Sequence, residues 1–170
     1  AMLILQELIR FHLQDAKPAA LVDVDLQRLQ FMYRQSVLEN KDTLYRDALL
    51  EIKSGYDRYP ASAQAGYLLA RLLYQEGSKY QSSLQDTTHQ FDIRAAKEIC
   101  EQEIKKFPGS EGGVNCRSLL EEIRTPHIDM QTEKVNIPGR PFRTLVSYKN
   151  VSKIYFRLAK VPDDYYERIS

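Results

Sequence analysis

The chain has 170 residues, of which 24 are basic and 23 acidic, so its formal net charge is +1 at pH 7. This length is sufficient for the core of one ordinary domain, and the small net charge excludes a global attraction to nucleic acid or to an anionic membrane. Hydrophobic residues make up 43% of the sequence, but they form no run near the roughly 20 apolar residues of a membrane span.

The first third of the chain has the spacing of amphipathic helices. Apolar residues at positions 4, 5, 8, 9 and 13 predict a first helix. Asp23 or Asp25 is expected to cap a second helix, whose apolar positions are Leu26, Leu29, Met32, Tyr33 and Val37. Asp42 or Thr43 is expected to cap a third helix over 43–58, with Leu44, Ala48, Ile52 and Tyr56 at a spacing of four.

A repeated pattern spans the middle of the chain. Tyr59-Pro60-Ala61-Ser62 recurs 48 positions later as Phe107-Pro108-Gly109-Ser110. In each copy a helix ends at an aromatic-Pro pair, and the next helix begins at a Ser that is expected to act as its N-cap. The same offset places apolar positions on one another: Ala48 on Ala96, Ile52 on Cys100, Tyr56 on Ile104, Leu68 on Cys116, and Leu72 on Leu120. Repeated helical hairpins of this kind are typical of scaffolds rather than of catalysts.

Residues 77–91 interrupt the repeat. They are polar and lack periodicity, which is typical of a surface loop. One helix is predicted before this segment, over about 62–75. Two helices are predicted after it, the first from a capping Asp92 to Phe107 and the second from Ser110 to about 125. Because a tetratricopeptide repeat is about 34 residues long, the offset fits one such repeat with an insertion of the length of this loop.

From His127 the pattern changes to that of β-strands. Apolar residues alternate with polar ones over 128–132, and the turn pair Pro138-Gly139 precedes further strands over 142–148 and 154–158. Three strands are too few for a β-sandwich. We therefore expect a mainly α chain with about six helices in tetratricopeptide-like antiparallel hairpins over 2–126. Over 127–170 we expect a short antiparallel β segment that either begins a larger β-domain or is a hairpin folded back on the helices.

The two cysteines occupy apolar positions of the repeat. Cys100 lies seven residues before Phe107 and Cys116 eight after Pro108, so the two should face each other across an antiparallel helix pair. Inward-facing positions can meet the limit of roughly 7 Å between Cα atoms that a disulfide needs. The alternatives are a disulfide, in an oxidising compartment, and two buried thiols that pack as small hydrophobes.

Few residues suggest chemistry. His12, His89 and His127 lie in different segments, each interpreted as having no Cys, Asp or Glu at metal-ligand spacing, and no nucleophile motif or glycine-rich phosphate loop is found. We therefore expect no catalytic residue, no metal and no cofactor. Tyr67 and Tyr74 form a candidate binding face. They would be exposed along a concave wall in a binding module, and buried in a scaffold without a deep groove.

The β-like segment is locally basic, with seven Lys or Arg residues between 127 and 161 against Asp129 and Glu133. These residues form either the solvated face of alternating strands or a docking face for an acidic neighbouring domain. Nucleic acid fits poorly as a partner, because neither a recognition helix nor an aromatic base-stacking platform accompanies the charges.

One segment resembles a known family. Gln131-Thr132-Glu133-Lys134, followed by Pro138-Gly139-Arg140-Pro141-Phe142 and by the alternating strand from Val146 to Tyr155, is similar to the first macroglobulin-like strands of bacterial alpha-2-macroglobulin-family proteins. Large members of that family place a tetratricopeptide-like helical region before these strands, which is the order found here.

The resemblance implies a non-catalytic scaffold or protein-interaction region of a large protease-inhibiting or protease-trapping protein. Such a protein would be periplasmic or held at the outer membrane by a lipid anchor outside these residues, and its partners would be its own downstream domains and proteases. Cys100-Glu101-Gln102 lacks one residue of the family's Cys-Gly-Glu-Gln thioester and lies in a predicted helix, so no functional residue is carried over. The alternative is a stand-alone tetratricopeptide-like module that binds peptide or glycan at the bacterial cell surface. A hydrolase, the third class, lacks a catalytic constellation.

Overall fold

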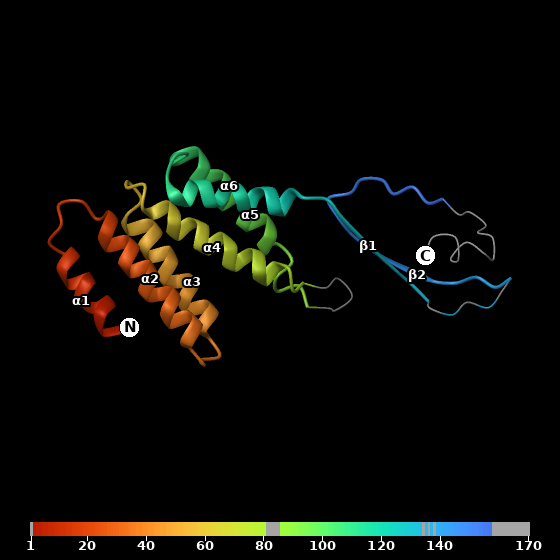
Figure 1. Cartoon of the computed structure of the whole chain (residues 1–170), viewed down its shortest axis with the longest axis horizontal. Helices are drawn as coiled ribbons and strands as arrows, with labels where there is room; N and C mark the ends of the chain where they lie inside the picture. The colour runs from red at the N-terminus through yellow and green to blue at the C-terminus, as the bar shows by residue number, and fades with distance from the viewer. Residues whose placement is uncertain (1, 81–85, 134, 136, 138, 158–170) are drawn as a thin grey trace, which may run out of the picture. The chain divides into compact units, whose positions relative to one another are not determined.

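The computed structural model describes residues 2–80, 86–133, 135, 137 and 139–157. Its elements are the helices α1 (Met2–His12), α2 (Ala19–Gln35), α3 (Lys41–Gly55), α4 (Ser62–Gly77), α5 (Asp92–Lys106) and α6 (Glu111–Arg124), and the strands β1 (His127–Thr132) and β2 (Thr144–Lys149) (Figure 1). The predicted mainly α fold with a short antiparallel β segment is thus confirmed, whereas the tetratricopeptide-like arrangement stays a prediction. The chain divides into two compact units, residues 1–123 and 124–170, and the sequence-based boundary lies after residue 126.

Helix α2 begins earlier than the sequence predicts. Its first residue is Ala19, and the Val22 N–H donates to the Pro18 carbonyl at 2.9 Å. Proline suits the start of a helix, because its missing N–H would have no intrahelical partner there. Asp23 and Asp25 consequently lie inside the helix instead of capping it, which corrects the prediction.

Of the predicted side-chain caps, only Ser110 is found. Its Oγ accepts the Gly113 N–H at 3.0 Å at the start of α6. The equivalent Ser62 makes no such cap bond, and its hydroxyl donates to the Tyr59 carbonyl at 2.8 Å. Asn40 and Phe91 precede α3 and α5 without side-chain cap bonds, so the caps predicted at Asp42 or Thr43 and at Asp92 are wrong.

Helix α4 is the centre of the helical unit. Ten of its sixteen residues are buried, and it packs against α3 and α5. Small residues allow the close approach: a Cβ at Gly66 would lie 2.7 Å from the Glu103 side chain of α5, and a Cβ at Gly112 of α6 would lie 2.1 Å from the Ala63 backbone. The interior position that the all-round apolar sequence of α4 predicts is therefore observed.

The two copies of the repeat form the same junction. The Ser62 N–H donates to the Tyr59 carbonyl at 3.0 Å, and the Ser110 N–H donates to the Phe107 carbonyl at 3.1 Å. Each of these serine hydroxyls also donates to the same carbonyl, at 2.8 and 2.9 Å. Equivalent positions in the helices share their burial, as in the pairs Ile52 and Cys100, and Leu72 and Leu120.

In the second unit, β1 and β2 pair antiparallel and form an amphipathic ribbon. Ile128 lies opposite Tyr148, and Met130 lies opposite Val146, so these four side chains share one face of the sheet. Ile128, Met130 and Tyr148 are each between 45% and 64% exposed.

The predicted third strand is absent from the described residues. Residues 154–157 have no regular secondary structure, and position 158 lies outside the description. Alternating apolar and polar residues indicate a preference for the pleated surface of a sheet, but a strand also needs a hydrogen-bonded neighbour. The described residues supply none for this segment.

Candidate functional site

A groove on the helical unit is lined by residues of three helices, and we call it the α2–α4 groove. Its volume is about 290 Å³, and its lining residues are Gln30, Tyr33, Arg34, Tyr45, Leu68, Arg71, Leu72 and Gln75. The rings of Tyr33 and Tyr45 stack at 4.3 Å between centroids and 12° between planes. The same two tyrosines also line a smaller depression of about 160 Å³ between α2 and α3. The aromatic pair therefore separates two adjoining hollows.

The charged residues that line the groove are both basic. Arg34 is exposed and donates from Nε to the Gln30 carbonyl at 3.2 Å. Arg71 lies 3.9 Å from Glu122 of α6, with its side chain 45% exposed. Such a distance between exposed groups makes a weak ion pair. Both arginines are thus accessible donors beside an apolar floor that includes Leu68 and Leu72.

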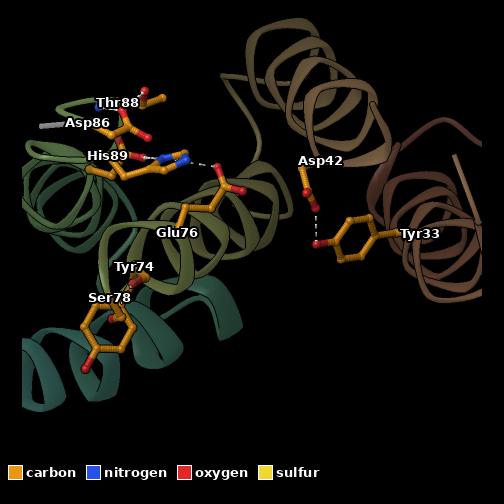
Figure 2. A network of polar contacts seen from close by, with 9 residues as sticks. Tyr33, Asp42, Tyr74, Glu76, Ser78, Asp86, Thr88 and His89 are labelled. Atoms are coloured by element: carbon orange, nitrogen blue, oxygen red, sulfur yellow. Dashed lines mark hydrogen bonds and ion pairs between the residues drawn. The ribbon is translucent and has the colours of Figure 1, made fainter. Parts of the chain in front are cut away.

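Tyr33 and Tyr45 are held as neutral phenols. The Tyr33 hydroxyl donates to Asp42 Oδ1 at 2.5 Å (Figure 2). Burial and this hydrogen bond raise the pKa of Tyr33 well above its usual range. Burial raises the pKa of Tyr45 to about 12, although the Arg34 cation acts in the opposite direction.

Tyr67 and Tyr74, the candidate binding face, lie elsewhere. Both are half-buried and pack against the hydrophobic core, and neither belongs to the lining of the two hollows beside Tyr33 and Tyr45. The binding face at Tyr67 and Tyr74 therefore stays a prediction. The groove tyrosines, Tyr33 and Tyr45, lie on neighbouring helices and meet through the packing of those helices, which residue type alone does not indicate.

A polar cluster joins the end of α4 to the start of α5. His89 Nδ1 lies 2.7 Å from Asp92 Oδ2 and 4.0 Å from Glu76 Oε2, and Figure 2 shows Glu76 and His89 pointing toward each other, with Asp86 and Thr88 beside them. The Thr88 hydroxyl and N–H both donate to Asp86, and these bonds lower the pKa of Asp86.

This cluster corrects the interpretation that no carboxylate stands at metal-ligand spacing from a histidine. The ligand atoms of Glu76, His89 and Asp92 all lie within 4.8 Å of one another. The His89-x-x-Asp92 spacing was visible in the sequence, whereas Glu76 is thirteen positions away and joins them only through the fold. His12 and Asp15 have the same local spacing and the same 2.7 Å contact.

Cys100 and Cys116 meet in the core, where the repeat offset places them. Both are fully buried free thiols, and they are hydrogen-bonded to each other. The bond with Cys100 and then burial raise the pKa of Cys116 far above its usual range, which keeps it protonated. The disulfide stays a prediction for an oxidising compartment, and two free thiols in a denatured, unreduced sample would refute it.

Comparison with known proteins adds no family to this description. No family model, no curated protein and no solved structure matches the chain. No helix among the described residues is both long and apolar enough to cross a membrane. The function is therefore argued from the groove and the ribbon themselves.

Proposed function

We propose that the chain is a non-catalytic protein-interaction scaffold whose α2–α4 groove holds a carboxylate-bearing peptide segment of a protein partner. The observation that carries this proposal is the composition of the groove. Arg34 and Arg71, its charged lining residues, flank an apolar floor and a stacked tyrosine pair. An aspartate, a glutamate or a chain terminus supplies the matching charge.

The chemistry of these side chains suits peptide recognition. A guanidinium can bind a carboxylate through two parallel N–H···O bonds, which fixes orientation as well as charge. Tyrosine and arginine are enriched at protein interfaces, because they combine a large apolar surface with a polar end. Tyr45 keeps little surface of its own, at 8% exposed, so it supports the more exposed Tyr33 as a rigid floor.

The proposal includes a larger context, the N-terminal part of a bacterial alpha-2-macroglobulin-like protein, with its downstream domains and proteases as partners in the periplasm or at the outer membrane. Two features support it: the resemblance within residues 131–155, and the amphipathic ribbon of β1 and β2. An isolated two-stranded hairpin is marginally stable, so a ribbon with exposed Ile128, Met130 and Tyr148 is suited to packing within a larger β-domain.

A peptide selection tests the proposed groove function. The purified chain is immobilised and exposed to a phage-displayed library of random peptides that covers acidic, neutral and basic sequences equally. We expect the selected pool to be enriched in Asp and Glu, and its binding to weaken with salt, because exposed charge pairs are screened. A selected pool that is neutral or basic, or the absence of any selected peptide, would contradict the proposal.

A further inference from the structure

Three potential metal ligands converge at the junction of α4 and α5. Glu76 lies in the last turn of α4, His89 in the segment before α5, and Asp92 is the first residue of α5. His89 and Asp92 lie three residues apart in one local turn, whereas Glu76 lies thirteen positions before His89, so its proximity to them is a product of the fold. The gap between Glu76 Oε2 and His89 Nδ1 is 4.0 Å, and that between His89 Nδ1 and Asp92 Oδ2 is 2.7 Å.

Glu76 is the least expected of the three. It is only 8% exposed, and its nearest charged partner among the described residues is the His89 ring at 4.0 Å. That distance is too long for a hydrogen bond. The Glu76 carboxylate points at the His89 ring across this gap (Figure 2), where an ion placed between the two groups would contact both.

We propose that Glu76, His89 and Asp92 bind one divalent transition-metal ion of the Zn²⁺ type. Zinc binds imidazole nitrogen and carboxylate oxygen at about 2.0–2.2 Å, so two ligands of one tetrahedral ion lie about 3.4 Å apart. The observed separations of 2.7 and 4.0 Å lie on either side of this value. Small side-chain rotations therefore bring the three groups to coordinating positions.

The ligand set favours zinc over calcium or magnesium. Those harder cations prefer oxygen ligands alone, whereas imidazole is a ligand of Zn²⁺, Fe²⁺ and similar ions. When a neutral His89 binds through Nδ1, its proton is carried on Nε2, and the hydrogen bond to Asp92 is replaced by coordination. The ion would join His89, in the described segment before α5, to the end of α4.

The test uses the full 170-residue chain without an affinity tag. Zinc chloride is titrated by calorimetry, and thermal unfolding is followed with and without zinc, since an ion that binds only the folded state raises its stability. The variants are His89→Ala and the nearly isosteric Glu76→Gln. His12→Ala is the matched control, because the His12–Asp15 pair has the same spacing and distance but belongs to no such triad among the described residues.

We expect one zinc ion per chain, a rise in the unfolding midpoint on adding zinc, and no displacement of zinc by excess Mg²⁺. His89→Ala and Glu76→Gln should each weaken zinc binding by about tenfold or more, while His12→Ala should bind as the wild type does. Circular dichroism of the zinc-free variants serves as the control that they are folded. Wild-type-like zinc binding by His89→Ala or by Glu76→Gln, or no binding by the wild type, would overturn the proposal.

Discussion

Glu103 of α5 is a buried charged residue of the helical unit. It is 3% exposed, and it reaches from α5 across Gly66 of α4 to form an ion pair with Lys53 of α3 at 3.0 Å. Three consecutive helices are thus joined by one buried carboxylate. This arrangement favours glycine at position 66, because a Cβ there would lie 2.7 Å from the Glu103 side chain, which would have to move.

Replacing Gly66 by alanine should therefore destabilise the chain. The new Cβ would lie 2.7 Å from Glu103 Cδ, and displacing that side chain weakens the pair with Lys53, for an expected loss of about 1–3 kcal/mol. Gly55→Ala is the matched control: its Cβ meets nothing within 4 Å, so it should be neutral or stabilising by up to about 1 kcal/mol. Urea unfolding measures the free energy of unfolding of both variants. Equal stability of the two variants would refute the steric account.

Tyr45 should ionise late when the folded chain is titrated with base. Its pKa of about 12 exceeds the ordinary 10 because it is buried. A raised folded-state pKa means that the associated stability is complete below pH 10 and is lost as the pH rises through 12. Phenolate absorbance should show a late step that is smaller in Tyr45→Phe. An unchanged late step in Tyr45→Phe would contradict the assignment.

At the scale of elements, apolar spacing was a reliable guide and capping was not. The helix pattern predicted all six helices, because burial of one face dominates their stability. Caps depend on a single hydrogen bond, and two serines at equivalent positions differ in it: Ser110 accepts the Gly113 N–H, whereas Ser62 makes no cap bond. The groove could not be predicted for a similar reason: Tyr33 and Tyr45 meet only because α2 and α3 pack together.

Ser110 should be the more important of two serines near α6. Ser110→Ala removes the bond from the Gly113 N–H and should cost about 1 kcal/mol, the usual effect of losing an N-cap. Ser118 lies exposed within the same helix, and its hydroxyl bonds the Val114 carbonyl at a long 3.5 Å, so Ser118→Ala should change stability by less than about 0.5 kcal/mol. Thermal unfolding of both variants measures these losses of stability. Similar losses in the two variants would show that the Ser110 cap contributes nothing specific.

At the scale of the whole molecule, two units with different chemistry follow each other. The helical unit buries a continuous core and offers a basic-rimmed groove, whereas the β unit exposes an apolar face. The sequence predicted the change near His127 because the period of its apolar residues changes there. It could not predict the end of the sheet at two described strands, since strand pairing is a non-local property.

The measurement that tests the central claim most directly is the affinity of a selected acidic peptide for two charge-matched double variants. Arg34→Ala/Arg71→Ala removes both groove cations, and Arg94→Ala/Lys97→Ala removes two from α5, where they pair with Glu98 and Glu101. Calorimetry should show binding about tenfold weaker, or about 1.4 kcal/mol, in the groove variant and little changed in the α5 variant. Equal affinities for the two variants would contradict the claim that the α2–α4 groove is the binding site.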